Sequence, residues 1–325
     1  MELIVRPPRR YHVSHDTVVE LERAILADAR VVPARSNAAF DSVVVGATRL
    51  LERVGTDMGS LLRIRRRSSI AGTPARDYLA VMMELDAAKA APWFIRTARR
   101  SIYVFDAWPS RHRDIRAFVE SWGIQYAFVS SSQAAARLAE LCDGCTFIWV
   151  PEGIDPAQYQ ALPLLEKDID VLQLGRKYDA HHTVIAPALE SAGKTYLYES
   201  PRGTIIFPGR DEFVAGLARS RISICVPSNI THPERAGDVE TMTVRFLQSM
   251  VSKCVVLGRA PAEMVQLFGY NPVVEIDMLN PAAQLLDILS HYQDYLPLVE
   301  RNFDVVTREH TWRDRWQQMA AVLLQ

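Results

Sequence analysis

The chain has 325 residues, 49% of them hydrophobic and 23% charged, so it can bury a large core, and its length predicts two domains. Its 37 basic and 38 acidic side chains give a formal net charge of −1, which argues against a dedicated nucleic-acid binder with a basic surface. No apolar run approaches the roughly 18 residues of a transmembrane helix, and the first apolar run is too short for a signal peptide. We therefore expect a cytoplasmic protein.

The first hundred residues have the least regular pattern. Residues 43–55 predict a strand followed by a helix, and residues 77–85 predict a strand. Between them lies a basic cluster, Arg63–Arg67, in which only Ile64 is uncharged. Such a cluster is typical of a solvated face, and a peripheral contact with phosphate or acidic lipid is its functional alternative.

After residue 98, apolar runs alternate with helical patterns, which indicates βαβ units. Gly123 stands where a helix should end, and Ser131 or Ser132 stands where the next should begin. In this first series we predict strands at 100–109, 124–131 and 146–153, and helices at 110–123 and 132–141.

A second series starts near Lys167. Its strands are predicted at 168–175, 194–200, 221–228, 254–259 and 272–277. Its helices are predicted at 183–193, 210–220, from 241 to about 251, and at 260–269, 280–290, 295–306 and 311–324. Strands that read as continuous apolar runs are typical of parallel sheets covered on both faces.

Three prolines between residues 151 and 163 indicate a boundary between these two series. The fold class predicted is therefore α/β, with two Rossmann-like domains, 1–155 and 156–325, that face a cleft. Ligands of such sheets bind beyond the carboxyl ends of the strands.

Two strand ends in the second series are candidate ligand sites. In Gly175-Arg176-Lys177, glycine permits a tight turn, and the two cations can neutralise phosphate. This turn is too short for a P-loop, and a βα turn with solvated charges is the alternative. If the other helix begins at 241–243, the backbone N–H groups there lack intrahelical partners and favour an anion such as a diphosphate. Glu240 would then face the ligand, or it would only stabilise the helix dipole.

The cysteines predict no metal site. Cys142 and Cys145 form a C-x-x-C pair, but Cys225 and Cys254 lie far apart in the sequence and supply no second pair. We expect reduced thiols.

Four segments are similar to motifs of one enzyme family, in the right order and spacing: "VPEGIDPAQY", "DVLQLGRK", "ETMTVRFLQSMVSKCVVLGRAP" and "REHTWRDRWQQM". Through them, residues 148–325 resemble the C-terminal domain of GT-B glycosyltransferases of glycosyltransferase group 1, especially the branch with spore-maturation-type proteins. The family carries a Glu-x7-Glu pair. Glu240 matches its first Glu, which faces the donor sugar, whereas Gln248 replaces the second, which holds the ribose hydroxyls. Ser252-Lys253 replaces the family's small glycine-rich turn.

The resemblance implies transfer of a sugar, hexosyl or related, from a nucleotide diphosphate to an acceptor hydroxyl. It implies retention, no cofactor and no tightly bound metal, because cations and helix N–H groups stabilise the leaving diphosphate. The donor would bind the second domain and the acceptor, whether saccharide, lipid-linked, protein or small molecule, the first. The donor-binding residues implied or considered are Gly175, Arg176, Lys177, Thr241, Met242, Thr243, Arg245, Gln248, His181 and His232.

Asp106 is the candidate base, because it stands where a strand of the first domain ends. A turn or capping role is its alternative. Two other functions stay open for the whole chain. One is a different enzyme on this architecture, such as a nucleotide-sugar epimerase or a phosphorylase. The other is a degenerate glycosyltransferase-like protein that binds a nucleotide sugar or a partner without catalysis, which Gln248 and Lys253 keep open.

Overall fold

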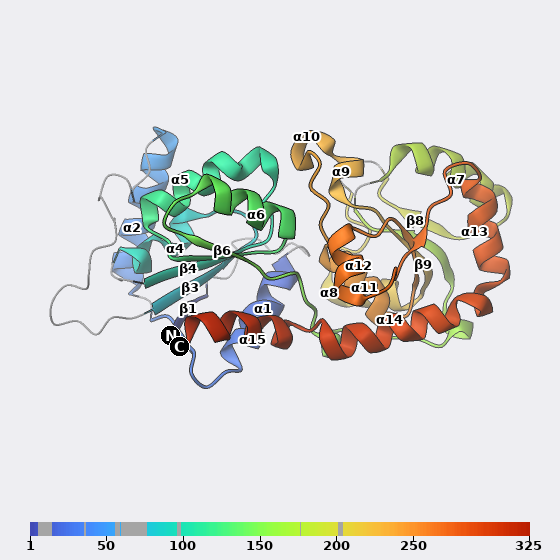
Figure 1. Cartoon of the computed structure of the whole chain (residues 1–325). Helices are drawn as coiled ribbons and strands as arrows, with labels where there is room; N and C mark the ends of the chain where they lie inside the picture. Colours follow the sequence, from blue (N-terminus) through green and yellow to red (C-terminus); the bar gives the residue numbers. More distant parts are fainter. Residues whose placement is uncertain are drawn as a thin grey trace. The chain divides into compact units, whose positions relative to one another are not determined.

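The computed structural model describes residues 1–5, 15–35, 37–55, 59, 77–95, 99–175, 177–200 and 204–325. Arg176 and the basic cluster at 63–67 lie outside these residues. The chain divides into two compact units, residues 1–151 with 315–325, and residues 152–314 (Figure 1). The acceptor and donor roles that we predict for residues 1–155 and 156–325 stay predictions.

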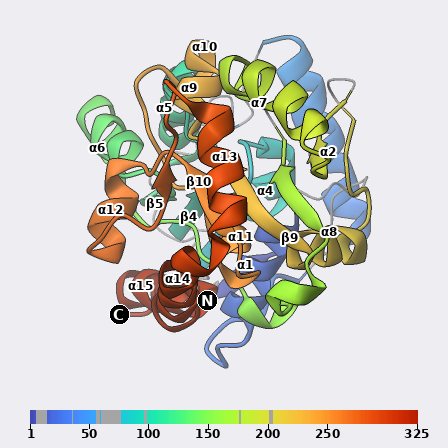
Figure 2. The ribbon, with the colours of Figure 1, turned by 90° about the vertical axis from the view of Figure 1, so that its right-hand side faces the viewer.

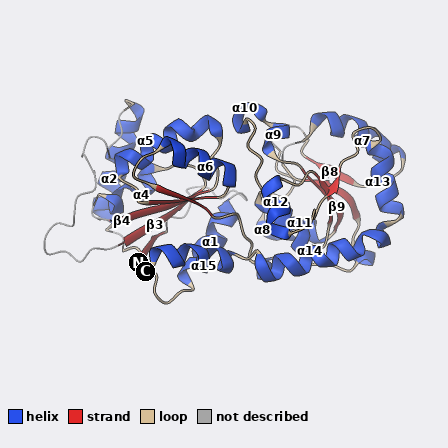
Figure 3. Cartoon of the chain, viewed as in Figure 1, coloured by secondary structure: helices blue, strands red, loops and turns tan. Residues whose placement is uncertain are grey.

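The first unit contains a six-stranded sheet whose described pairings are all parallel, in the order β2-β1-β3-β4-β5-β6 (strands red in Figure 3). Its strands are β1 (Glu2–Ile4), β2 (Val32–Pro33), β3 (Asp77–Met82), β4 (Arg99–Val104), β5 (Tyr126–Val129) and β6 (Thr146–Trp149). Its described helices are α1 (Asp16–Leu26), α2 (Ala38–Arg53), α4 (Ala87–Phe94), α5 (His112–Trp122) and α6 (Ser132–Leu141).

The helix punctuation read from the sequence is confirmed in this unit. Gly123 ends α5 with φ +58°, a left-handed conformation that glycine adopts without steric cost. The Ser131 side chain accepts a hydrogen bond from the backbone N–H of Ala134 and so caps α6.

The strand predicted at the start of 43–55 is wrong, because α2 runs from Ala38 to Arg53 without interruption. The run Val43-Val44-Val45 suggested a strand, but Asn37 caps a helix here by accepting from the backbone N–H of Phe40. Val44, Val45 and Thr48 lie on the buried face of α2, so burial of that face outweighs the strand propensity of valine.

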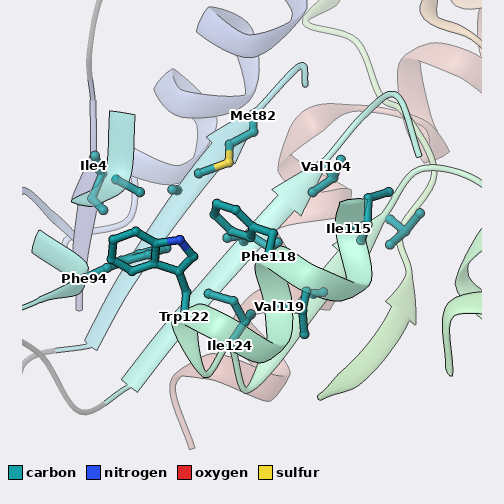
Figure 4. Close-up of a cluster of buried hydrophobic side chains, with 14 of the residues drawn as sticks. Ile4, Met82, Phe94, Val104, Ile115, Phe118, Val119, Trp122 and Ile124 are labelled. Atoms are coloured by element: carbon teal, nitrogen blue, oxygen red, sulfur yellow. The ribbon is translucent and has the colours of Figure 1, made fainter. Parts of the chain in front are cut away.

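The core of the first unit lies between the sheet and its helices. Trp122 and Phe118 of α5 pack with Phe94 of α4, against strand residues that include Ile4 and Val104 (Figure 4). The last helix, α15 (Trp312–Leu323), contributes the Trp316 indole N–H, which donates to Asp28 at 3.0 Å.

The second unit contains a five-stranded parallel sheet in the order β11-β10-β9-β7-β8. Its strands are β7 (Ile169–Gln173), β8 (Tyr196–Tyr198), β9 (Ser220–Cys225), β10 (Val255–Gly258) and β11 (Val274–Glu275). Its helices are α7 (Asp179–Ser191), α8 (Arg210–Ala218), α9 (Ser228–Thr231), α10 (Pro233–Ala236), α11 (Val244–Val251), α12 (Ala262–Phe268), α13 (Pro281–Ser290) and α14 (Leu296–Glu309), and they can be followed in Figure 2.

Because all strands of this sheet run parallel, the residues that follow them gather at one edge. Gly175 follows β7 and Arg259 follows β10, while Glu240 precedes α11. At the opposite edge, where the strands begin, Lys167 precedes β7 and is 3% exposed. Its ammonium donates to the carbonyl oxygens of Ala218, Ser220 and Ser252 at 2.8–2.9 Å.

Candidate functional site

The turn after β7 and helix α11 meet through Arg245. The guanidinium of Arg245 donates to the carbonyl oxygen of Leu174 at 3.0 Å. Gly175 has φ +68°, and a Cβ at this position would lie 3.0 Å from Nη1 of Arg245. The positive φ favours glycine at this position, and the guanidinium, at the end of a flexible side chain, would have to shift slightly to admit a Cβ. The structure thus brings together two of the residues predicted to bind the donor.

The start of α11 differs from the prediction. The helix begins at Val244, not at 241–243, because Thr243 is extended (φ −98°, ψ 157°). The backbone N–H of Met242 and the hydroxyl of Thr241 both donate to Glu263 at 2.8 Å. These groups are occupied by a buried carboxylate, so they do not form the first turn of a helix.

A second carboxylate meets the first residue of α11 itself. The backbone N–H of Val244 donates to Glu152 at 2.6 Å. Glu152 is 7% exposed. A carboxylate is a favourable group at the N-terminus of a helix, where the unpaired N–H groups and the helix dipole both attract negative charge. Glu152 therefore already takes one of the N–H donors that a diphosphate would use.

Glu240 is held by two neighbours. One carboxylate oxygen accepts from the side-chain amide of Asn229, on α9, at 3.3 Å. The same oxygen lies 3.5 Å from the guanidinium of Arg259, which follows β10. The Glu240 side chain is 22% exposed, and that of Arg259 is 57% exposed. Glu240 is thus an accessible, oriented carboxylate at the carboxyl edge of the sheet.

Gln248 lies on the second turn of α11 and is 6% exposed. Its amide nitrogen donates to the hydroxyl oxygen of Tyr159 at 2.9 Å. Arg210, the first residue of α8, donates to the same oxygen at 3.3 Å, and its guanidinium carbon lies 4.7 Å from the centre of the tyrosine ring. We expected the Gln248 amide to bond a hydroxyl group of a ligand. Its nitrogen instead donates to the hydroxyl of Tyr159.

Lys177 belongs to a group of aromatic and polar side chains beside β8. Its ammonium lies 5.1 Å from the centre of the Tyr198 ring. Nδ1 of His182 lies 3.0 Å from the hydroxyl of Tyr196, which donates in turn to Gln173 at 2.7 Å. Burial, together with the charge of Lys177, lowers the pKa of His182. The lowered pKa favours the neutral form of the His182 ring.

His181 points into the core instead of joining that group. It is fully buried and stacks on Tyr178 at 6.4 Å between ring centres, and neither ring nitrogen has a hydrogen-bond partner among the described residues. Burial lowers the pKa of His181 to about 4, with a smaller contribution from His182, so the ring is neutral near pH 7.

Two further candidates are His232 and Asp106. His232 joins α9 to α10 and is half-buried. Asp106, in the first unit, follows β4, is half-buried, and donates its backbone N–H to Met83. The role of Asp106 as a base stays a prediction.

Four residues of this edge were missed from the sequence: Glu152, Tyr159, Arg259 and Glu263. Glu152 and Tyr159 stand within the motif "VPEGIDPAQY", and Arg259 within the segment quoted with α11, but nothing in the spacing tells which side chains face the edge.

Three further results concern metals, thiols and membranes. Among the described residues, no group of three or more His, Cys, Asp or Glu side chains is arranged to hold a metal ion. All four cysteines are free thiols. Within the described parts of the chain, no helix is both long and apolar enough to cross a bilayer.

No family model matches the sequence. No curated protein matches it either. Among solved structures, HepE of Anabaena, determined with UDP and glucose and with UDP-glucose, has a TM-score of 0.58 at 10% identity, over 99% of both chains. WaaG, a glycosyltransferase involved in lipopolysaccharide biosynthesis, has a TM-score of 0.51 at 11% identity, over 99% of both chains. TarM has a TM-score of 0.51 at 7% identity, and the match covers 77% of this chain but only 55% of TarM. This chain therefore has the fold of the GT-B glycosyltransferases.

Proposed function

We propose that this chain is a glycosyltransferase that moves a hexosyl or related sugar from a nucleotide diphosphate to an acceptor hydroxyl. The observation that carries the proposal is the fold, which matches HepE, a structure determined with UDP-glucose, over 99% of both chains. The motifs of the second half favour the spore-maturation-type branch of glycosyltransferase group 1. We further propose retention of configuration and no requirement for a bound metal.

The leaving diphosphate is assigned to the turn after β7. Charge develops on the diphosphate as the glycosidic bond breaks, so fixed cations stabilise the transition state more than the bound donor. Arg245 reaches this turn, and Lys177 lies two residues beyond Gly175. Arg176, which stands between them in the sequence, is assigned the same role.

The sugar is assigned to Glu240 and the ribose to Gln248. Asn229 and Arg259 hold the Glu240 carboxylate in place, which suits a group that must stay oriented toward a sugar hydroxyl or the reacting carbon. Thr243 and His232 complete the proposed donor site. Thr241, Met242 and His181, which were also predicted to bind the donor, are buried and are assigned no contact with it. The acceptor is assigned to the first unit, with Asp106 as its base.

A panel of UDP, ADP, GDP, CDP and dTDP, each with Mg²⁺ and with EDTA, tests donor binding through the midpoint of thermal unfolding. A ligand that binds only the folded state raises that midpoint, so one nucleotide is expected to stand out, equally in both conditions. A shift that requires Mg²⁺ contradicts metal independence. No shift with any of the five contradicts the proposed donor site.

The role of Glu240 is tested with the matching UDP-, ADP-, GDP-, CDP- or dTDP-glucose. Release of the nucleoside diphosphate, with water or added saccharides as acceptor, is expected to fall at least about a hundredfold in Glu240→Gln, as for other groups that act at the reacting centre. Affinity for the diphosphate should not change. Glu166→Gln, at an exposed position, is the matched control. Unchanged turnover in Glu240→Gln removes Glu240 from the mechanism.

A second candidate function is binding without transfer. It is favoured by Glu152, whose carboxylate takes the backbone N–H of Val244 that would otherwise stabilise the charge on a leaving diphosphate. Under this alternative the panel shows a selective shift, but no diphosphate is released from any nucleotide sugar, and Glu240→Gln changes neither result.

A further inference from the structure

The hydroxyl of Tyr159 organises a contact that the proposed function does not use. Tyr159 is 9% exposed and lies in the proline-containing stretch 151–163, 89 residues before Gln248. Its oxygen accepts from the Gln248 amide at 2.9 Å and from Arg210 at 3.3 Å. Both contacts use the phenolic oxygen as an acceptor.

Arg210 also fixes the tyrosine ring, because its guanidinium carbon lies 4.7 Å from the ring centre. A cation over an aromatic face restrains the ring as well as its hydroxyl. The position of the Tyr159 oxygen is thus set by a residue of α8, independently of Gln248.

This arrangement determines which side of the Gln248 amide is available. A glutamine amide can present an acceptor oxygen or a donor nitrogen, and the two are interchanged by a rotation. With the nitrogen bound to Tyr159, the oxygen of Gln248 accepts no hydrogen bond from any residue that the structure describes. The side chain therefore offers a ligand an acceptor oxygen, as a carboxylate would, but without the negative charge.

We infer that Tyr159 is a positioning residue which, backed by Arg210, turns the Gln248 amide so that its oxygen accepts a hydrogen bond from a ribose hydroxyl of the donor. This inference rests on the proposed function, in which Gln248 binds the ribose. The inference explains how Gln248 can replace the second Glu of the family's Glu-x7-Glu pair and still bind the ribose.

The test compares each ribonucleotide with the same nucleotide lacking one hydroxyl. The full chain is titrated calorimetrically with UDP, ADP and GDP and with the 2′-deoxy and 3′-deoxy form of each. For the nucleotide that binds, we expect the wild type to prefer the ribose form over one of the two deoxy forms by about fivefold, as for one neutral hydrogen bond. Because the readout is a ratio, it does not depend on the folded fraction of a variant.

In Tyr159→Phe the amide is free to rotate, so the preference should fall to below about twofold. Gln248→Glu should keep the preference, since both carboxylate oxygens are acceptors. The double variant Tyr159→Phe with Gln248→Glu should regain it, a rescue that a purely structural role for Tyr159 does not predict. Tyr270→Phe, which removes a hydroxyl bonded to Asn302 elsewhere in the same unit, is the control.

Three results would overturn the inference while diphosphate binding stands: no preference in the wild type, an unchanged preference in Tyr159→Phe, or its loss in Gln248→Glu, which would show that the amide donates. Absence of binding by UDP, ADP and GDP overturns the inference. If CDP and dTDP also give no shift in the thermal panel, the donor site is overturned with it.

Discussion

Arg245 and Leu174 are joined by a 3.0 Å hydrogen bond from guanidinium to carbonyl oxygen, which ties helix α11 to the turn after β7. The contact places a cation beside the end of a strand and a glycine with positive φ. It also links two segments that the sequence treats as separate candidate sites.

Arg245→Lys should weaken diphosphate binding. Lysine keeps the charge, but one ammonium cannot bond the Leu174 carbonyl and a phosphate with the fixed geometry of a guanidinium. We expect a loss of about tenfold in affinity, equal to about 1.4 kcal/mol, as for a charge-assisted hydrogen bond. Calorimetric titration with the nucleotide selected by the panel measures it. Arg219→Lys, in an exposed pair with Asp168, should leave the affinity unchanged; equal effects in both variants would contradict a local role for Arg245.

Glu152→Gln should strengthen diphosphate binding. The amide oxygen can still accept from the N–H of Val244, while the negative charge near the ligand is removed. A gain of about fivefold corresponds to about 1 kcal/mol of relieved repulsion. The same titration measures it, beside the exposed Glu166→Gln. If Glu152→Gln binds the diphosphate more weakly, the carboxylate does not compete with the ligand and only caps α11.

His181 should make stability depend on pH. Folding lowers the pKa of His181 from 6.5 to about 4. Between these two pH values the imidazole is protonated in the unfolded chain and neutral in the folded chain. The stabilising contribution is complete above pH 6.5 and is lost as pH falls from 6.5 to about 4, by up to about 3 kcal/mol. Urea unfolding at pH 4.5, 5.5, 6.5 and 7.5 measures the slope.

In His181→Asn this part of the slope should disappear, because asparagine does not titrate. His291→Gln, at an exposed residue paired with Asp287, is the control and should keep it. A slope that is unchanged in His181→Asn would assign the acid sensitivity to other groups.

Lys167→Met should destabilise the protein at pH 7. Methionine fills similar space but leaves the carbonyl oxygens of Ala218, Ser220 and Ser252 without the ammonium that now bonds all three. We expect the free energy of unfolding to fall by about 3 kcal/mol, measured by urea denaturation. Lys194→Met, at a less buried lysine of the same unit, should change it by less than about 0.5 kcal/mol. Equal losses in both variants would argue against a special role for the buried ammonium.

The alternation of strands and helices could be predicted because each element carries its own signal. The apolar runs of β4 and β9 and the glycine at the end of α5 are local features, and local features survive in the fold. The valine run of α2 was misread because its burial depends on packing against α4, which no local pattern contains.

The candidate site could be predicted only in part. The position of Gly175 follows from a strand followed by a tight turn, and the structure adds Arg245 to it. The contacts of Glu152 with Val244 and of Tyr159 with Gln248 join residues 92 and 89 positions apart. Their pairing depends on how α11 packs on the sheet edge, and no periodicity encodes that.

Gly258 ends β10 directly opposite Cys225 of β9, and a Cβ there would lie 1.6 Å from the Cys225 carbonyl oxygen. That oxygen also accepts the backbone N–H of Arg259, whose side chain faces Glu240. A methyl group at 258 must therefore push apart the two strands that end beside Asn229 and Arg259. In a mutational scan scored by turnover, substitutions at position 258 would therefore abolish activity as if the residue were catalytic. Glycine has no side chain that could take part in catalysis, and its contribution is the close spacing of β9 and β10.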